Sequence, residues 1–353
     1  MARALTLAIR GWGRVAPNPM VGAVVLRDGV ALAEGFHAEF GGAHAERVAL
    51  DHCADARGAT CVVTLEPCAH TGKTPPCVEA LVERGVTRVV TAGRDPHPVG
   101  GGGLDRLRAA GVEVEVGVGA REAAALNAGY LWSTARPDRP FVAVKVAASL
   151  DGFLADHAGR SQWISGPEAR EWAQWLRAGF DAIAVGGRTA VADDPRLTVR
   201  GPVTPRVPPA RVVFAGDLPL PASLRVLQVE GGGPPMVVMR SQAAGLGRDL
   251  GASGVRVLVA DDLPASLRAL AETGIRTILV EGGGRLIGGL LDQGLVDRVY
   301  RMTAPLWLGR GTPAFGGETA RDLSNAERWT VVERRAWGED TLLVVDRALC
   351  LRA

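Results

Sequence analysis

The chain has 353 residues, and its 40 basic and 38 acidic residues leave a net charge of +2. This near balance gives no bulk attraction for nucleic acid, so a nucleic-acid partner is not expected. Apolar residues make up 47% of the chain and charged residues 22%, which is typical of a globular protein. The length suits about two domains of ordinary size.

The composition also argues against a membrane protein and against a disulfide framework. The longest apolar runs, such as RVVFA and TILVE, are as long as strands and far shorter than a bilayer span. Residues 1–13 resemble a short amphipathic helix rather than a secretory signal. Four of the five cysteines lie between Cys53 and Cys77, which favours a reducing, cytoplasmic setting.

Residues 1 to about 130 alternate strand and helix patterns, which predicts a three-layer α/β domain. A hairpin is predicted over residues 21–37, because Asp28 and Gly29 separate two apolar runs. The following patterns predict helices over 44–54, 77–85 and 103–111, and strands over 59–67, 86–93 and 112–118.

Residues 133–141 are polar and contain two prolines, so we interpret them as a linker. We therefore assign residues 1–136 to one domain and residues 140–353 to another. The second domain repeats the α/β pattern, with a loop over 201–210. It predicts helices over 166–179 and 288–295, and strands over 141–152, 180–187, 210–216, 235–240, 255–260, 276–284, 297–309 and 341–347.

The first domain contains residues of the types and order of a catalytic zinc site. His44 lies two residues before Glu46, Cys68 is expected at the end of a strand, and Cys77 opens a helix. One imidazole and two thiolates leave the fourth position of tetrahedral zinc open for an activated water. Glu46 then suits the general acid and base that carries a proton to a leaving amine. The spacing departs from the zinc-deaminase signature P-C-x-x-C, because eight residues separate Cys68 from Cys77.

This hypothesis carries a geometric condition. Residues i and i+2 inside a helix lie about 200° apart, so His44 must start its helix if both side chains are to face one point. A structural zinc site and a site without metal are the alternatives. Cys53 and Cys61 lie in apolar patterns, and we interpret them as core residues.

The segments around the zinc candidates can bind substrate. The insertion between the two cysteines predicts a loop beside the metal, where His70, Lys73 and Thr74 can hold a phosphate or ribose. Asn18 can face a pyrimidine edge, and His37 is either a second contact or a packing residue.

Two glycine-rich turns of the second domain can bind phosphate. VEGGGR at 280–285 is a strand, a turn and a helix start, which can present backbone N–H groups to an anion. VGGRT at 185–189 has the same arrangement, and two such turns suit a dinucleotide. Neither has the G-x-G-x-x-G pattern of a Rossmann domain, and tight turns without any ligand remain the alternative. The chain holds only two lysines, Lys73 and Lys145, so each is a candidate for a specific role.

Both sets of motifs resemble those of one family, the bifunctional riboflavin-biosynthesis deaminase–reductases. The resemblance covers nearly the whole chain and rests on seven motifs in the family's order: PNPMVG (17–22), HAE (44–46), TLEPCAHTGKTPPC (64–77), KVAASLDG (145–152), SQWIS (161–165), ADDPRLTVR (192–200) and EGGGRLIGGLL (281–291). It implies a cytidine-deaminase-like three-layer α/β/α domain followed by a dihydrofolate-reductase-like α/β domain.

The resemblance implies two reactions. The first domain would deaminate 2,5-diamino-6-(5-phosphoribosylamino)pyrimidin-4-one to 5-amino-6-(5-phosphoribosylamino)uracil, with one Zn²⁺ per chain. The second would reduce the ribosyl group to ribityl with NADPH. The resemblance also implies a homo-oligomer. The alternative is a deaminase whose second domain binds nucleotide without turnover.

The resemblance also assigns residues. His44, Cys68 and Cys77 would bind zinc, and Glu46 would transfer the proton. The positions that match cofactor contacts are Ala147, Trp163, Thr189, Asp193, Gly283, Gly284, Arg285, Leu286, Ile287, Gly288 and Gly289. The positions that match substrate contacts are Ser161, Arg177, Leu197, Arg200 and Glu281, with Lys145 as a cation near the sugar or its phosphate. Arg177 and Arg200 are expected to bind a phosphate bidentately.

Two positions depart from the family pattern. Arg188 stands where a small residue is expected, and it either alters cofactor contact or supplies charge for the 2′-phosphate of NADPH. His97 stands where an asparagine is common, in a segment rich in glycine.

Overall fold

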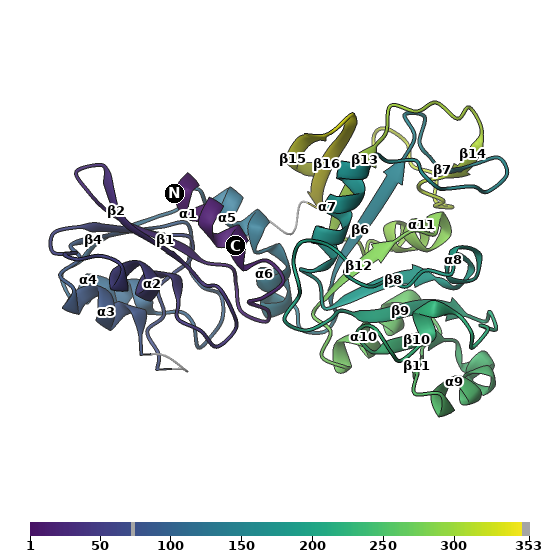
Figure 1. The fold of residues 1–353 in the computed structure, drawn as a ribbon, viewed down its shortest axis with the longest axis horizontal. Coiled ribbons are helices and arrows are strands. Elements are labelled where there is room, and N and C mark those ends of the chain that lie inside the picture. Colours follow the sequence, from purple (N-terminus) through teal and green to yellow (C-terminus); the bar gives the residue numbers. More distant parts are fainter. Residues whose placement is uncertain (72–74, 348–353) are drawn as a thin grey trace. The chain divides into compact units, whose positions relative to one another are not determined.

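The computed structural model describes residues 1–71 and 75–347 of the chain. Its contacts divide it into two compact units, Met1–Ala135 and the part that begins at Arg136. Each unit is built on its own β-sheet (Figure 1).

The first unit has a five-stranded sheet in the order β2-β1-β3-β4-β5. The pairs β2–β1 and β1–β3 are antiparallel, and the pairs β3–β4 and β4–β5 are parallel. Its elements are α1 (Ala2–Ala8), η1 (Ile9–Gly11), β1 (Gly22–Arg27), β2 (Val30–Phe36), α2 (Ala45–Asp51), β3 (Thr60–Val63), α3 (Cys77–Glu83), β4 (Arg88–Thr91), α4 (Gly103–Ala109), β5 (Glu113–Val116), α5 (Ala120–Leu126) and α6 (Ala128–Ala135).

Alternating side chains of β1 give this sheet two apolar faces. Ala23 and Val25 pack with α2, α3 and α4, whereas Val24 packs with Leu7 of α1. Helices therefore cover both faces, and the predicted three-layer α/β/α fold is confirmed. The predicted hairpin also forms, with Asp28 and Gly29 at positive φ in its turn.

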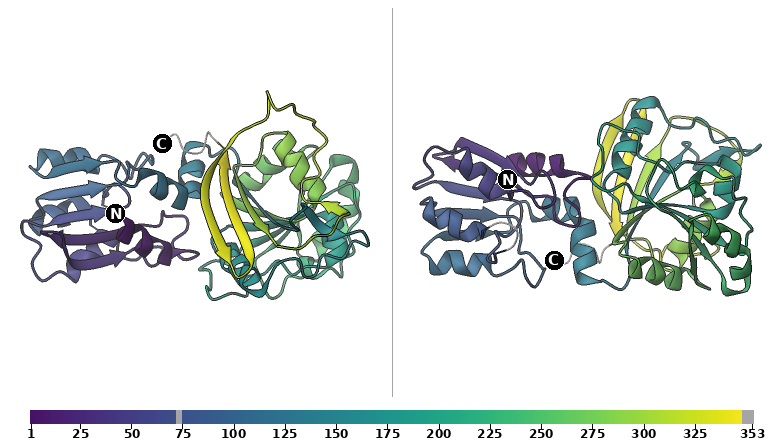
Figure 2. Two further views of the ribbon diagram at one scale, coloured as in Figure 1. Left: turned by 90° about the horizontal axis from the view of Figure 1, so that it is seen from above. Right: turned by 60° about the horizontal axis from the view of Figure 1, so that its bottom comes forward.

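The second unit has a nine-stranded sheet in the order β11-β10-β9-β8-β12-β6-β13-β16-β15. The strands from β11 to β13 run parallel, and β16 and β15 add an antiparallel hairpin at one edge, drawn in yellow in Figure 2. Its nine strands are β6 (Phe141–Ala148), β8 (Ala182–Gly186), β9 (Ala210–Gly216), β10 (Pro235–Met239), β11 (Arg256–Val259), β12 (Thr277–Glu281), β13 (Arg298–Thr303), β15 (Trp329–Trp337) and β16 (Asp340–Arg347). The strands β7 (Phe153–Asp156) and β14 (Gly311–Pro313) form a separate antiparallel pair.

Helices cover both faces of this sheet as well. One face packs on α10 and α11, and the other packs on α8, α9 and η2. The helices are α7 (Pro167–Arg177), α8 (Gly187–Asp193), η2 (Arg225–Leu227), η3 (Ser241–Gly247), α9 (Arg248–Ala252), α10 (Leu263–Glu272) and α11 (Gly284–Asp292). The described residues include no helix that is long and apolar enough to cross a membrane.

Three predictions about local structure need correction. The linker was predicted over 133–141, but α6 extends to Ala135 and β6 begins at Phe141. The strand predicted over 59–67 ends at Val63, so Cys68 lies in a loop. Just beyond that end, the Glu66 carboxylate accepts hydrogen bonds from the backbone N–H groups of Asp95 and Leu104 and so fixes the loop. The strand predicted over 297–309 ends at Thr303, shortly before Pro305, which has no N–H to donate.

Candidate active sites

His44, Cys68 and Cys77 converge in the first unit. The His44 Nδ1 atom lies 3.4 Å from the Cys68 Sγ atom and 3.3 Å from the Cys77 Sγ atom. Candidate ligand atoms of the three residues all lie within 4.8 Å of one another. One nitrogen and two sulfurs are the donor set of a catalytic zinc centre, which needs only three protein ligands.

Local structure brings these side chains together. His44 is the N-cap of α2 in an extended conformation, which meets the condition that it start its helix. Gly35 of β2 allows α2 to begin close to the sheet, because a Cβ atom there would lie 2.3 Å from the Ala45 carbonyl oxygen. Cys77 is the first residue of α3, and its backbone N–H donates to the Cys68 sulfur at 3.4 Å.

Glu46 lies in the first turn of α2, and only 3% of its surface is exposed. Burial raises the pKa of its carboxyl group to about 7. A carboxyl group with such a pKa can both accept and donate a proton near neutral pH, which is what a proton shuttle requires.

The two cysteines differ although they are neighbours. The hydrogen bond from the Cys77 thiol, supported by His44, lowers the pKa of Cys68 to about 4. The same contact raises the pKa of Cys77. Two adjacent thiolates need a cation between them, so this pair is suited to a divalent metal. Cys53 and Cys61 are instead buried in the core cluster, as interpreted from the sequence.

His37 lies beside His44, and Asn18 contacts His37. The His37 Nδ1 atom lies 3.0 Å from the Ala43 carbonyl oxygen, so this nitrogen is the donor. The Nε2 atom then accepts from the Asn18 side-chain N–H at 3.3 Å. His37 also contacts the His44 ring edge-on, with 5.6 Å between the ring centroids. The structure thus brings both residues next to the metal candidates and fixes the orientation of the Asn18 amide.

The loop between the cysteines is described only in part. The His70 Nδ1 atom is buried and has no hydrogen-bond partner among the described residues. Lys73 and Thr74, which were predicted to contact substrate, lie outside the described residues. His97 lies in an exposed turn and accepts from the Val99 backbone through Nδ1.

In the second unit, Lys145, Glu281 and Arg177 form a half-buried charged cluster. Lys145 of β6 and Glu281 of β12 are direct neighbours across parallel strands. Arg177 reaches Glu281 from α7 through two hydrogen bonds of 2.8 and 2.6 Å. Burial lowers the pKa of Lys145, and Glu281 opposes that change. Burial also opposes the charge on Glu281, but Arg177 holds the pKa of its carboxyl group below the usual value.

Arg177, which was predicted to contact substrate, is held by neighbouring groups of the protein. All three of its nitrogens donate within the protein, two to Glu281 and one to the Thr198 carbonyl oxygen. Its bidentate face is therefore occupied by a carboxylate rather than free for a phosphate. Arg200 is exposed, but partial desolvation of its guanidinium group and the nearby Arg177, Arg196 and Arg225 lower its pKa.

Four other predicted substrate or cofactor residues differ in how exposed their side chains are. Ala147 lies half-buried on the same face of β6 as Lys145. Trp163 is 69% exposed, and the Arg170 guanidinium lies 4.7 Å from its ring centroid. Ser161 is half-buried two residues earlier. The Leu197 side chain packs into the core, so only its backbone is available to a ligand.

A cavity of about 760 Å³ opens at the carboxyl ends of β8, β9, β10, β11 and β12. Of the predicted cofactor positions, it is lined by Thr189, Gly283, Arg285 and Leu286. Gly283 has a φ of +85°, and a Cβ atom there would lie 3.0 Å from the Thr189 hydroxyl oxygen. The remaining positions do not line this cavity. Asp193 ends α8, Ile287 is buried in the core, Gly284 and Gly288 pack on residues 313–317, and Gly289 lies beside Leu263.

Comparisons with known proteins match both units. Residues 1–93 match the family model described as the cytidine and deoxycytidylate deaminase zinc-binding region, and residues 140–343 match the RibD C-terminal domain. The riboflavin biosynthesis protein RibD of Aquifex aeolicus is 38% identical over 351 residues, which cover 98% of this chain and 97% of that protein. RibD of Escherichia coli is 39% identical over 364 residues and covers 97% of both.

The chain belongs to the RibD family. A solved structure of a diaminohydroxyphosphoribosylaminopyrimidine deaminase/5-amino-6-(5-phosphoribosylamino)uracil reductase from Thermotoga maritima agrees. It is 37% identical, covers 99% of this chain and 97% of its own, and has a TM-score of 0.83. An Acinetobacter baumannii RibD structure is 35% identical, covers 98% and 97%, and has a TM-score of 0.81. The resemblance, the two fold classes and the nature of the protein as a riboflavin-biosynthesis enzyme with deaminase and reductase domains are confirmed.

Several residues of this RibD-family site were not predicted from the sequence. Asp217, Arg240, Asp261 and Asp262 line the cavity, and each lies within three residues of the end of a parallel strand. The signal that could have found them is the rule that ligands of open α/β sheets bind outside the carboxyl ends of the strands.

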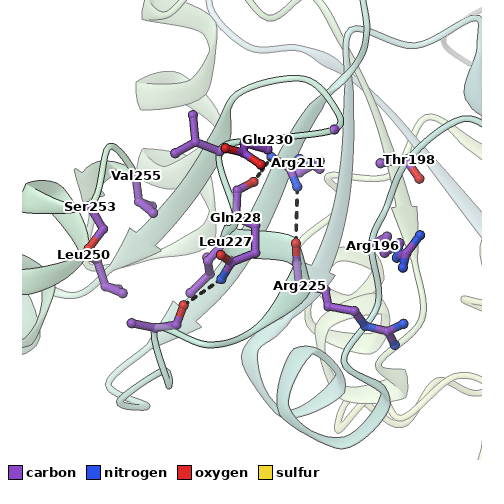
Figure 3. A pocket seen from close by; sticks show the side chains of 13 residues that line it. Arg196, Thr198, Arg211, Arg225, Leu227, Gln228, Glu230, Leu250, Ser253 and Val255 are labelled. Carbon is purple, nitrogen blue, oxygen red and sulfur yellow. Dashed lines mark hydrogen bonds between the residues drawn. The ribbon is translucent and has the colours of Figure 1, made fainter.

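A second cavity, of about 670 Å³, is lined by three arginines (Figure 3). The Arg211 side chain is 1% exposed and donates to the carbonyl oxygens of Gly233, Arg225 and Gln228. Arg225 is paired with Asp194 at 3.0 Å. Arg211 thus anchors the segment that contains η2, which was not apparent from its position inside an apolar strand pattern.

Proposed function

We propose that the first unit deaminates 2,5-diamino-6-(5-phosphoribosylamino)pyrimidin-4-one, and that the second unit reduces the ribosyl group of the resulting uracil to ribityl. The observation that carries the proposal is the convergence of His44, Cys68 and Cys77 beside the buried Glu46, in a chain whose RibD relatives match over nearly their full length. The alternative, a second domain without turnover, has no specific observation in its favour.

In the deaminase unit, His44, Cys68 and Cys77 would hold Zn²⁺. The fit rests on the donor set, since a nitrogen and two sulfurs within 4.8 Å match the ligands that zinc prefers. Bound zinc would supply a Lewis acid that activates water. Glu46 would take a proton from that water and pass it to the amino group, which leaves as ammonia while the water oxygen becomes the uracil carbonyl.

Asn18 and His37 would orient the pyrimidine in this unit. Because the His37 Nε2 atom holds the Asn18 N–H, the amide oxygen of Asn18 is the group left to accept from the substrate. His70, Lys73 and Thr74 would contact the phosphoribosyl part, and the buried His70 nitrogen without a partner supports a polar ligand nearby.

In the reductase unit, NADPH would bind in the cavity at the strand ends and supply a hydride to C1′ of the sugar. The fit rests on the Gly282–Gly283 turn, where positive φ at both residues exposes the start of α11 to the cavity. The C1′–O4′ bond of the ribosyl ring breaks, and O4′ gains a proton. Lys145 would provide that proton, and its neighbour Glu281 on β12 favours the charged form of its amine. Ser161, Leu197 and Arg200 would complete the substrate site, and Ala147, Trp163 and Asp193 the cofactor site.

We assign the deaminase activity to residues 1–136 and the reductase activity to residues 140–353. We also propose a cytoplasmic homo-oligomer that acts on this small molecule and binds neither nucleic acid nor membrane. Four free, buried cysteines, two of them proposed as thiolate ligands, support a reducing compartment.

The test follows NADPH oxidation by absorbance after the diaminopyrimidinone phosphate is added to the zinc-loaded wild type and to Glu46→Gln. Wild type should oxidise NADPH. The variant should lose at least about a hundredfold of that rate, because general acid–base catalysis contributes 10²–10⁴. Addition of the deaminated uracil should restore oxidation in the variant. If the uracil gives no oxidation even with wild type, the second unit is not the proposed reductase. If Glu46→Gln oxidises NADPH normally with the diaminopyrimidinone, the role of Glu46 is wrong.

A further inference from the structure

Asn127 is a buried polar residue of the first unit that the proposed mechanism does not use. It is 4% exposed and lies between α5 and α6 as the C-cap of α5 (Figure 1). Its backbone N–H donates to the Ala123 carbonyl oxygen at 3.1 Å, and its own carbonyl oxygen accepts from the Leu131 N–H at 3.0 Å. Both helices therefore hold the backbone of Asn127, and its side chain remains to bind another segment.

The Asn127 side chain forms two hydrogen bonds with the backbone of Met20, 107 residues earlier. The Met20 N–H donates to the Asn127 Oδ1 atom at 2.8 Å, and the Asn127 Nδ2 atom donates to the Met20 carbonyl oxygen at 2.9 Å. A side-chain amide has an acceptor and a donor side by side, so it can satisfy both groups of one residue, whereas a carboxylate only accepts. Because buried backbone groups without partners are costly, Asn127 fixes the position of Met20.

The segment that contains Met20 lacks two of its backbone donors. Pro17 and Pro19 have no N–H, and residues 16–21 form neither helix nor strand. The Met20 side chain belongs to an apolar cluster against which Leu126, the last residue of α5, packs. Packing and hydrogen bonds from the same end of α5 thus act together on this segment.

Asn18, two residues before Met20, is the residue that this segment presents to the candidate metal site. Its Nδ2 atom lies 3.3 Å from the His37 Nε2 atom, and the His37 ring contacts the His44 ring edge-on. The His37 backbone N–H also donates to the Val21 carbonyl oxygen at 2.9 Å, so the segment is joined to His37 on both sides of Met20. A shift of Met20 would therefore move the Asn18 amide relative to His37.

We propose that Asn127 is a positioning residue of the deaminase, which holds Met20 so that the Asn18 amide faces the pyrimidine. The inference rests on the proposed function, in which Asn18 orients the substrate. Asn127 acts through the backbone of residues 18–20 and not by touching the pyrimidine. Misplacement of a substrate contact by about 1 Å can lower a rate about a hundredfold, so a residue remote from the metal ligands can control the reaction.

The experiment compares four variants with wild type in the full-length, zinc-loaded protein: Asn127→Ala, Asn127→Asp, Asn18→Ala and the double variant Asn18→Ala/Asn127→Ala. Aspartate has nearly the shape of asparagine, but its carboxylate cannot donate to the Met20 carbonyl oxygen, so this variant separates the hydrogen bond from packing. Thermal unfolding and zinc content show that each variant is folded and loaded. If Asn127→Ala does not fold, Asn127→Asp decides.

Arg27→Ala is the matched control. The Arg27 side chain donates two hydrogen bonds of 2.9 and 2.7 Å to the backbone carbonyl oxygens of Asp55 and Arg57. Arg27 is the last residue of β1, whereas the segment of Met20 leads into the first residue of that strand. The control therefore removes a similar pair of side-chain-to-backbone bonds from the opposite end of β1.

Two measurements report on the inference. Ammonia release from the diaminopyrimidinone phosphate gives kcat and KM. Spectra of ¹⁵N-histidine-labelled protein report the hydrogen bond between Asn18 and His37 without turnover. The chain has only 6 histidines, so its spectrum is simple, and a His37→Gln variant identifies the His37 signal.

Both Asn127 variants should lose roughly 10- to 100-fold of kcat/KM while they keep the zinc content of wild type. The loss should divide between KM and kcat as it does in Asn18→Ala, because the same substrate contact is affected. The double variant should be at most about threefold slower than Asn18→Ala alone, since both substitutions remove one contact. The His37 signal should shift in the Asn127 variants toward its position in Asn18→Ala. Arg27→Ala should match wild type in both measurements.

Other outcomes overturn the inference. An unchanged His37 signal in the Asn127 variants would show that Asn127 does not position Asn18. Losses that add fully in the double variant would mean that the two residues act independently, and an equal loss in Arg27→Ala would mean that general destabilisation explains the effect. If Asn18→Ala deaminates normally, the proposed role of Asn18 is wrong and the inference fails with it. If wild type releases no ammonia, the proposed deaminase function is wrong, and the histidine spectra still decide whether Asn127 fixes Asn18.

Discussion

The two candidate sites of this RibD-family chain are built in opposite ways. The deaminase site consists of a few buried side chains whose ligand atoms lie within 4.8 Å of one another. The reductase site is spread over a sheet face, where Lys145 and Glu281 lie, and over the ends of several strands around a cavity of about 760 Å³. A metal needs a few soft donors at one point, whereas a dinucleotide needs a long surface with backbone donors and occasional charges.

That difference predicts how the activity of each site responds to a single substitution. Removing one metal ligand should abolish one activity entirely and leave the rest of the chain unchanged. Removing one reductase residue should have a graded effect, because neighbouring contacts persist. Mutations in the two units therefore test whether the contrast holds.

The largest effect is expected for Cys77→Ser. A serine hydroxyl is a poor zinc ligand, so the variant should lose bound zinc and at least about a thousandfold of deaminase rate, since a catalytic metal contributes several kcal/mol. Metal content by mass spectrometry and ammonia release measure this. NADPH oxidation with the deaminated uracil should be unchanged.

Cys53→Ser is the matched control for this variant. Cys53 is a buried core cysteine of the same unit, 4% exposed, and it is not one of the three clustered ligands. Its replacement should leave the zinc content intact. Equal zinc loss in both variants would mean that unfolding of the unit, rather than ligand removal, explains the result, and full zinc retention in Cys77→Ser would exclude the proposed ligand set.

A smaller effect is expected for Glu281→Gln in the reductase unit. The Arg177–Glu281 pair is only 12% exposed on each side chain, and loss of the carboxylate leaves Arg177 and Lys145 without a counter-charge. We expect a loss of about 3 kcal/mol in the free energy of unfolding, as for other buried pairs that lose one partner. Asp194→Asn at the exposed Arg225 pair should cost less than about 1 kcal/mol. Denaturant unfolding of the second unit measures both.

The pH dependence of that loss has a defined sign. The folded pKa of Glu281 lies below the ordinary value of 4.5, so its stabilisation is present above pH 4.5 and is lost as the pH falls through the folded pKa. The stability difference between wild type and Glu281→Gln should therefore shrink below pH 4.5. A difference that stays constant from neutral to acidic pH would show that the carboxylate charge is not the source of the effect.

The contrast between the sites also explains what the sequence could predict. His44, Cys68 and Cys77 are of two types that the chain uses rarely, with 6 histidines and 5 cysteines, and they stand with Glu46 in a recognisable order, so the members of the metal cluster could be predicted. The position of Cys68 was not, because the loop after β3 is held by long-range contacts: the Glu66 carboxylate accepts hydrogen bonds from the backbone N–H groups of Asp95 and Leu104, which lie 29 and 38 residues away. In the second unit, the pairing of Arg177 with Glu281 was not predicted, because it depends on tertiary packing across 104 residues.

The glycine-rich run of α11 allows the finest test, because there the backbone rather than a side chain builds the site. A Cβ atom on Gly288 would lie 2.3 Å from the Gly317 nitrogen, whereas one on Gly289 would meet only the end of the Leu263 side chain at 3.3 Å. Gly288→Ala should therefore destabilise the second unit by about 1–3 kcal/mol, since the backbone of residues 316–317 must shift. Gly289→Ala should be neutral or stabilising by up to about 1 kcal/mol, because alanine favours the helix. Thermal unfolding and NADPH titration of both variants measure this. Equal destabilisation by the two substitutions would mean that Gly288 is not needed for the close packing of α11 on residues 316–317. The contrast between a site built by backbone and a site built by side chains would then not hold at α11.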